Sequence, residues 1–237
     1  MKYLSHAAAF ALLLGPATAI AGPVAEFETQ FRDMYQTYRA ALFQTNTGQA
    51  EPSAKALAAF ADKWDALRQT FEQTPPPHYA DDAQWGAVIG AINDDLTKAQ
   101  SLVASGDLPG AHEALEDVRD TFWALHKRNS VETFSDRMNA YHAEMEHVLA
   151  MDLANLDSTT QTALVERAAV MAYLAADLLA QPPVEAAGNA EFGKLAAQFR
   201  GSVEQFQTAA RTGAPGAIRA AVDNLKKPYA VFFLKFG

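Results

Sequence analysis

Two pairs of histidine and glutamate residues have a spacing that lets both side chains of a pair reach one point. His112 precedes Glu116 by four residues, and His142 precedes Glu146 by the same interval. Residues at positions i and i+4 share one face of an α-helix. Imidazoles and carboxylates from facing helices are a common way to bind a metal ion within a helical bundle. The two pairs therefore predict a metal site, provided that both stretches are helical and adjacent.

Two side chains close to the second pair are candidate additional ligands. Met145 follows His142 by three residues, and His147 follows Met145 by two. A thioether beside imidazoles suits copper, above all Cu(I), whereas imidazole with carboxylate also suits iron. We therefore expect copper or iron. The simpler interpretation, that Met145 only fills the core, stays open at this point.

A second simple interpretation concerns the charged side chains. Arg119 lies on the same strip of its predicted helix as Glu116. It can form an ion pair with Glu116 or with Glu146, in which case the two pairs belong to a solvated helix face rather than to a metal site.

The flanking sequence predicts two helices joined by a short turn. Residues 127–131 separate the two helical patterns, so we expect a tight turn with Asn129 or Ser130 as the N-cap, and helices that pack side by side. Apolar residues recur at alternating spacings of three and four on both sides of this turn, at Leu108, Ala111, Leu115, Val118, Phe122 and Leu125, and then at Phe134, Met138, Tyr141, Met145 and Val148.

The chain repeats itself after 107 residues. Pro75-Pro76 superposes on Pro182-Pro183, and Gly106 superposes on Gly213, without a gap. We therefore predict an all-α fold of two tandem, antiparallel, up-down-up-down four-helix bundles, at residues 22–130 and 131–237, with no sheet. The expected helices span 24–44, 54–73, 80–104 and 108–128, and then 131–151, 159–180, 187–211 and 215–234.

Residues 1–21 have the composition of a secretory signal peptide. Lys2 supplies a positive charge, residues 7–14 are apolar, and Ala19-Ile20-Ala21 resembles a cleavage site. The mature chain is then expected to begin at Gly22 and to lie in the periplasm. No other stretch has the apolar length that a membrane-spanning helix needs.

The amino-acid composition and the missing motifs exclude several classes of function. The sequence contains no cysteine, which excludes thiolate metal sites, thiol catalysis and covalent c-type haem attachment. Its net charge of −9 argues against nucleic acid and anionic membranes as partners. The sequence shows neither a glycine-rich phosphate loop nor a recognisable set of partners for a nucleophilic Ser or Thr. We therefore expect a non-enzymatic metal-binding protein that works with a periplasmic redox or transport partner.

The first repeat unit resembles the cytochrome b562/cytochrome c′ group of four-helix bundles. The resemblance rests on a Pro-Pro turn after the second helix, the segment 91–96 (AINDDL), the turn at Gly106, and a fourth helix that ends at His126-Lys127-Arg128. In that group a methionine early in the first helix and a histidine near the end of the fourth ligate haem b. The resemblance implies Met34 and His126 as ligands, and electron transfer as the alternative function. Phe233 stands where the second unit would need its histidine, so one haem at most is expected.

A third hypothesis needs no cofactor. The second unit has Arg219 and Asp223 in place of His112 and Glu116, and its end is rich in aromatic residues, including Phe232, Phe233 and Phe236. If these were exposed, they would form a docking patch for an envelope partner. Their helical spacing favours burial instead. A cofactor-free interaction module is thus a second alternative.

Overall fold

The computed structural model describes residues 22–237, and the predicted signal peptide lies outside them. The fold is all-α, as predicted, and the described residues contain no strand. The α-helices are α1 (Pro23–Asn46), α2 (Ala50–Phe71), α3 (Trp85–Ser105), α4 (Leu108–Arg128), α5 (Phe134–Leu149), α6 (Ser158–Ala180), α7 (Ala190–Thr212), α8 (Pro215–Asp223) and α9 (Lys226–Phe236). Two short 3-10 helices, η1 (Pro77–Tyr79) and η2 (Val184–Ala186), follow the Pro-Pro turns.

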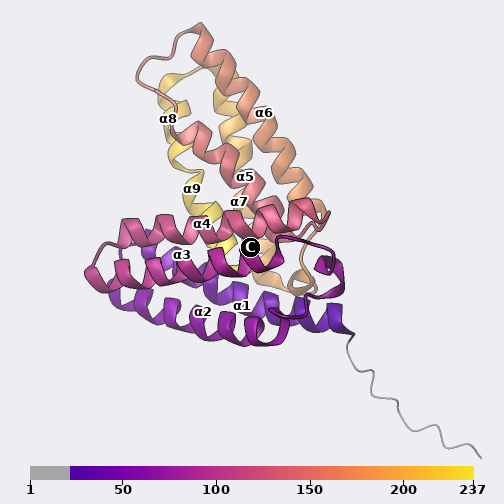
Figure 1. Ribbon diagram of the computed structural model, residues 1–237. Helices are drawn as coiled ribbons and strands as arrows, with labels where there is room; N and C mark the ends of the chain where they lie inside the picture. The colour runs from indigo at the N-terminus through magenta and orange to yellow at the C-terminus, as the bar shows by residue number, and fades with distance from the viewer. Residues whose placement is uncertain (1–21) are drawn as a thin grey trace, which may run out of the picture.

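The first helix group consists of α1 to α4. Each of these helices packs against its neighbours in the chain, and α4 returns to α1, which closes a ring (Figure 1). Two buried polar contacts hold the ring: the Trp64 indole donates to Asn93 Oδ1 at 2.7 Å, and the Tyr38 hydroxyl donates to the carbonyl of Leu115 at 2.8 Å. Buried donors that find acceptors in this way avoid the cost of desolvation. The long α4, which carries His112 and Glu116, is therefore fixed against α1.

Glycine ends helix α3 in a conformation that a side chain disfavours. Gly106 has a φ of +84°, in the left-handed region. We expect Gly106→Ala to lower the free energy of unfolding by about 1 kcal/mol. Gly90 lies inside α3, and a Cβ there would meet nothing within 4 Å. Gly90→Ala should raise the free energy of unfolding by about 0.5–1 kcal/mol. Urea denaturation of Gly106→Ala and Gly90→Ala measures both changes. Equal changes in the free energy of unfolding would contradict the role assigned to the left-handed conformation of Gly106.

The second helix group consists of α5 to α9. Helices α5, α6 and α7 follow one another around this group, and α9 closes it by contacting α7 and α5. The expected helix at 215–234 was wrong as a single element, because the chain breaks between Asp223 and Lys226 into α8 and α9. The cause is Pro228, which has no N–H to donate to the carbonyl of Asn224 one turn earlier. Such a proline is tolerated in the first turn of a new helix, where N–H groups have no partner within the helix.

Helix α5 begins later than the sequence indicated. Its N-cap is Thr133, whose hydroxyl accepts from the Asp136 amide at 3.2 Å while the Asp136 carboxylate accepts from the Thr133 amide at 2.7 Å. This capping box satisfies donors at both ends of the first turn. The expected caps, Asn129 and Ser130, serve the turn instead: Asn129 donates to Asp82 Oδ2 at 2.7 Å, and Ser130 has a φ of +55°.

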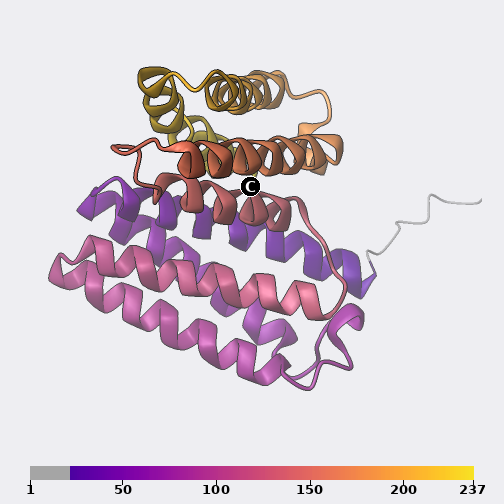
Figure 2. The ribbon, with the colours of Figure 1, turned by 90° about the horizontal axis from the view of Figure 1, so that it is seen from above.

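The two groups cross steeply. In Figure 1 helices α1 to α4 run across the view while α5, α6 and α7 stand upright, and Figure 2 shows the groups from above as stacked layers. The turn predicted after α4 is present, but the prediction that α4 and α5 pack side by side was wrong. Helix α9 packs against both α1 and α5, so it occupies the angle between the groups. None of the helices in residues 22–237 is both long and apolar enough to cross a membrane.

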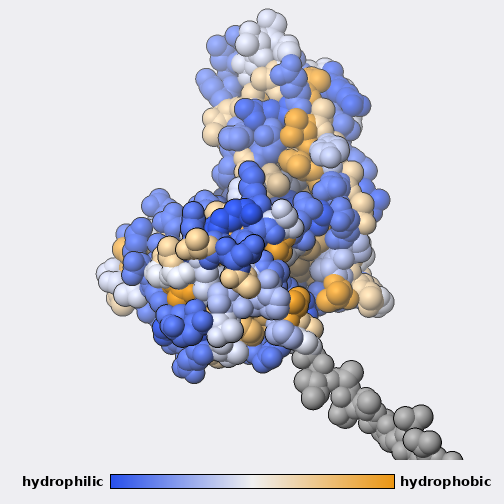
Figure 3. Space-filling model, turned by 45° about the vertical axis from the view of Figure 1, so that its right-hand side comes forward, coloured by the Kyte–Doolittle hydropathy of each residue, from blue (hydrophilic) through white to orange (hydrophobic). Residues whose placement is uncertain are grey.

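The surface carries no exposed patch at the C-terminal aromatics. Phe232, Phe233 and Phe236 are buried, with 0%, 6% and 9% of their surface exposed. On the face shown in Figure 3, apolar side chains form small separate spots on a mostly hydrophilic surface. The docking patch considered for these three phenylalanines is therefore not formed, because they pack into the core of the second group.

Candidate metal site between the helix groups

A cleft of about 620 Å³ lies between the two helix groups, and we call it the junction cleft. Its walls come from the end of α1, most of α4, the part of α5 from Asn139 to His147, and most of α9. All six residues predicted for the metal site line this cleft: His112, Glu116, His142, Met145, Glu146 and His147. The structure thus brings together side chains from both groups, although α4 and α5 are not parallel neighbours.

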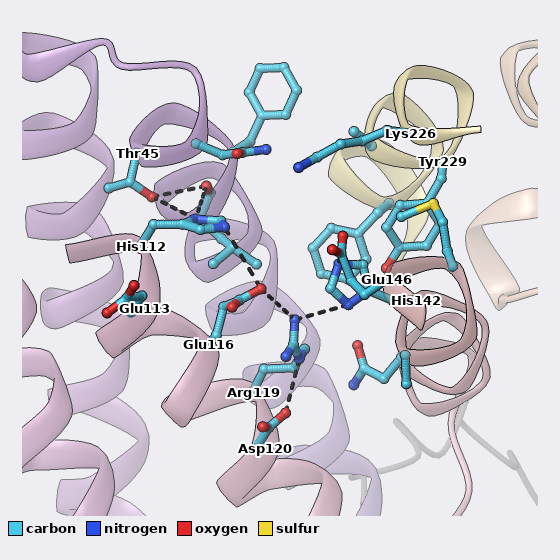
Figure 4. Close-up of a pocket in the computed structure, with 18 of the residues that line it drawn as sticks. Thr45, His112, Glu113, Glu116, Arg119, Asp120, His142, Glu146, Lys226 and Tyr229 are labelled. Carbon is cyan, nitrogen blue, oxygen red and sulfur yellow. Dashed lines mark hydrogen bonds and ion pairs between the residues drawn. The ribbon is translucent and has the colours of Figure 1, made fainter. Parts of the chain in front are cut away.

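His112 is held in place by α1. Its Nδ1 lies 3.2 Å from the carbonyl oxygen of Leu42 and 3.2 Å from the hydroxyl of Thr45 (Figure 4). A carbonyl can only accept, so we assign the proton to Nδ1 and the lone pair to Nε2. Burial lowers the pKa of His112, against the opposing effect of Glu116. The neutral imidazole therefore directs a lone pair toward Glu116 Oε1, 3.7 Å away.

His142 is held in place by its own group and by Arg119. Its ring stacks on Tyr229, with centroids 5.3 Å apart and the planes inclined by 27°. Its Nδ1 accepts from Arg119 Nη1 at 3.3 Å, which leaves Nε2 to donate to Glu146 Oε1 at 3.4 Å. That hydrogen bond from His142 lowers the pKa of Glu146. His142 and Glu146 thus form one hydrogen-bonded unit.

The guanidinium of Arg119 lies between the two pairs. Arg119 Nη1 is 3.1 Å from Glu116 Oε1 and 3.3 Å from His142 Nδ1, and its Nε donates to Asp120 Oδ1 at 3.1 Å. Burial alone would lower the pKa of Arg119, but Tyr38, Glu116 and Asp120 raise it above its ordinary value. In Figure 4, His112 and Glu116 lie on one side of Arg119, and His142 and Glu146 lie on the other. A positive charge therefore already lies where the two pairs face each other.

The two additional ligand candidates make other contacts. Met145 is fully buried and belongs to the core of the second group, as the simpler interpretation proposed. The exposed His147 turns toward Glu144 Oε2, 3.3 Å from its Nδ1. Within residues 22–237, no three His, Asp or Glu side chains lie close enough to hold a metal ion as they stand. Metal binding in the junction cleft therefore requires side-chain movement.

Sequence reasoning missed three residues of the junction cleft. Asn139 is buried, with 3% of its surface exposed, and its Oδ1 has no hydrogen-bond partner among the described residues. Lys226 and Tyr229 come from α9, and Figure 4 shows the Lys226 side chain reaching into the cleft. Asn139 precedes His142 by three residues, so its position on the same helix face was available from the sequence. The contribution of α9 was not, since it depends on the crossing of the groups.

The two residues implied as haem ligands lie elsewhere. Met34 is fully buried in the core of the first group. His126 is 3% exposed, and its Nδ1 donates to Asp136 Oδ2 at 2.9 Å. Its ring lies between Phe31 and Tyr79, with centroids 5.5 Å and 6.3 Å away. Neither Met34 nor His126 lines the junction cleft. The haem hypothesis stays a prediction from the sequence.

A second histidine near His126 makes stability depend on pH. Burial lowers the pKa of His78, opposed by Glu28 and reinforced by His126. Protonation then favours the unfolded chain, so stability falls as pH drops below the ordinary histidine value of about 6.5. We expect the free energy of unfolding of His78→Gln to change less between about pH 7 and about pH 5 than that of the wild type. Denaturant titrations across this range check it, and parallel curves would refute it.

The chain matches no protein-family profile, no curated protein and no solved structure at a significant level. The resemblance to the cytochrome b562/cytochrome c′ group therefore rests on the sequence motifs alone, and the candidate site rests on its geometry.

Proposed function

We propose that this protein is a non-enzymatic metal-binding protein of the periplasm, and that the junction cleft binds a copper or iron ion. The observation that carries the proposal is the position of Arg119 Nη1, 3.1 Å from Glu116 Oε1 and 3.3 Å from His142 Nδ1. These acceptors belong to different helix groups, and both already face a cation. An ion that displaces the guanidinium meets the same two acceptors.

Each proposed ligand has a lone pair and a supporting contact. His112 would bind through Nε2, because its Nδ1 is engaged by Leu42 and Thr45. His142 would bind through Nδ1 while Nε2 continues to donate to Glu146. An imidazole whose second nitrogen donates to a carbonyl or carboxylate is the usual form of a metal-ligating histidine. Glu116 completes the set, and the bonds to the ion would link α4 to α5.

The choice of copper or iron follows from the ligand types. Imidazole with carboxylate suits both metals, and a thioether favours copper. His147 borders the same cleft and is exposed, so a rotation of its side chain would bring a further imidazole toward the ion. Met145 also borders the cleft, but it would have to move out of the core of the second group to bind. Glu116 keeps 33% of its side-chain surface exposed, so it can turn toward an ion without opening the core. Glu146, 46% exposed, supports the site through its hydrogen bond from His142.

Two further parts of the proposal concern origin and location. We propose that the two helix groups derive from one duplicated four-helix unit. This is supported by Gly106 and Gly213, which both end a helix with a positive φ, and by the 3-10 helices after both Pro-Pro turns.

The periplasmic location rests on residues 1–21. A redox or transport protein that delivers or receives the ion is the expected partner.

Metal content tests the proposed function. The protein purified from the periplasm should contain copper or iron, and the double variant His112→Ala, His142→Ala should contain much less. His78→Ala is a matched control: the side chain of His78 is 19% exposed, against 23% for His112 and 16% for His142, and it lies outside the cleft. Equal metal content in the wild type and the double variant would refute the proposal.

A further inference from the structure

A second cleft, of about 530 Å³, lies between α1 and the second helix group. We call it the Arg39 cleft. Arg39 lines it and is only 9% exposed. Phe134, Val184 and Phe236 line the same cleft from the second group. The Arg39 cleft is separate from the junction cleft, and the two have no lining residue in common.

Arg39 has no carboxylate partner among the described residues. No Asp or Glu oxygen of residues 22–237 lies within 4.0 Å of its guanidinium, whereas Arg32, which lines the same cleft, forms such pairs with Glu28 and Glu185. Its Nη2 donates to the carbonyl of Lys235 at 3.4 Å, and its buried Nε has no partner. Arginine stays charged even where burial lowers its pKa, as it does here. A buried charge of this kind is costly unless an opposite charge accompanies it.

The acidic side chains of the Arg39 cleft already have other partners. Glu185 pairs with Arg32 at 3.5 Å, and Asp33 pairs with Lys63. Glu28 lies 3.2 Å from His78 and 4.0 Å from Arg32. Burial raises the pKa of Tyr35, over which Arg39 lies at 5.9 Å, to about 12, so its hydroxyl is neutral at physiological pH. Glu185 acts on Arg39 through space and opposes the lowering of its pKa, but no acidic side chain of the cleft forms an ion pair with Arg39.

We infer that the Arg39 cleft binds a small organic anion, with a carboxylate or phosphate group on Arg39 and an apolar part against Phe134, Val184 and Phe236. A guanidinium that turns its Nε and one Nη toward such a group can donate two parallel hydrogen bonds to it. A volume of about 530 Å³ is in the range of small-molecule sites. This inference does not depend on metal binding in the junction cleft.

Isothermal titration with matched probes tests the inference. Benzoate carries a carboxylate on an apolar ring, and benzamide is its neutral counterpart. Benzoate should bind the full-length protein at least about tenfold more tightly than benzamide, because one charged hydrogen-bonded pair is worth about that factor. Inorganic phosphate, titrated against sodium chloride at equal ionic strength, shows whether the site prefers phosphate to carboxylate. Equal affinities for benzoate and benzamide, with no response to phosphate, would overturn the inference.

Two variants locate the binding. Arg39→Gln should weaken anion binding at least about tenfold. Arg32→Gln, which removes an exposed arginine from the same cleft, should change it less than about threefold. Circular dichroism confirms that each variant is folded, and Arg39→Met, which also removes the charge, replaces Arg39→Gln if the latter unfolds. Anion binding that survives the Arg39 substitution, or is lost equally with Arg32→Gln, would overturn the inference.

Gly237 also lines the Arg39 cleft, so a free carboxylate on Gly237 would be a competing partner for Arg39. A variant extended by Ser-Gly-Ser after Gly237 distinguishes the two. We expect the extended protein to bind benzoate as the wild type does. If only the extended protein binds benzoate, the counter-charge of Arg39 is the terminal carboxylate and the inference is wrong.

Discussion

Replacing Arg119 with glutamine should tighten the binding of Cu²⁺ by at least about tenfold. The guanidinium lies against both Glu116 and His142, so an incoming ion must displace it and then overcome its repulsion. Two unit charges about 4 Å apart interact by about 4 kcal/mol at the effective dielectric constant of a protein surface, and each 1.4 kcal/mol is a factor of ten. Glutamine keeps a hydrogen-bond donor without the charge. Competition titration with a chelator of known affinity measures the change.

Arg137→Gln is the matched control for this experiment. The side chains of Arg119 and Arg137 are 12% and 10% exposed, and each forms two ion pairs with carboxylates. Arg137 does not line the junction cleft. Both variants change the net charge equally, so the Cu²⁺ affinity of Arg137→Gln should stay near that of the wild type. If Arg119→Gln binds Cu²⁺ no more tightly than Arg137→Gln, the guanidinium does not occupy the place of the ion.

Asp136→Ala should give the largest loss of stability, about 3–5 kcal/mol in the free energy of unfolding. This buried carboxylate accepts from the Thr133 amide, the Thr133 hydroxyl and His126 Nδ1, all within 3.0 Å. Its removal breaks the capping box of α5 and leaves the buried His126 without its partner. Because His126 belongs to α4, the contact also joins the two helix groups at their turn.

Asp157→Ala is the control that separates the cost of losing an N-cap from the cost of losing the buried contact between Asp136 and His126. Asp157 caps α6 by accepting from the Thr160 amide at 2.8 Å, and it lies on the surface. Its loss should cost about 1 kcal/mol, the usual value of an N-cap. Guanidinium chloride denaturation compares the two variants. A cost for Asp136→Ala that does not exceed that of Asp157→Ala would show that the His126 contact contributes little.

Local features of the fold could be predicted from the sequence. The alternation of apolar residues in α4 and α5 gave the buried faces correctly, since helical spacing alone decides which side chains share a face. Gly106 and the Pro-Pro turns marked the helix ends, because their backbone preferences do not depend on the rest of the molecule. The same reasoning placed His112 near Glu116, and His142 near Glu146.

Features that depend on distant contacts could not be predicted. The steep crossing of the groups arises where α9 packs on α1 and α5, and nothing in the 127–131 turn encodes that contact. The start of α5 was missed because Thr133 and Asp136 form a stronger cap than Asn129 or Ser130. The position of Arg119 between the two His/Glu pairs could not be predicted either. Its guanidinium contacts His142 only across the junction of the two helix groups, and so depends on how the groups cross.

Pulsed electron paramagnetic resonance of the Cu²⁺-loaded protein tests the central claim most directly, because it counts the imidazoles bound to the ion. We predict two imidazoles in the wild type, one in His112→Ala and one in His142→Ala, since one ligand comes from each helix group. A single imidazole in the wild type, or a wild-type spectrum that persists in His142→Ala, would contradict a metal site that joins the two groups.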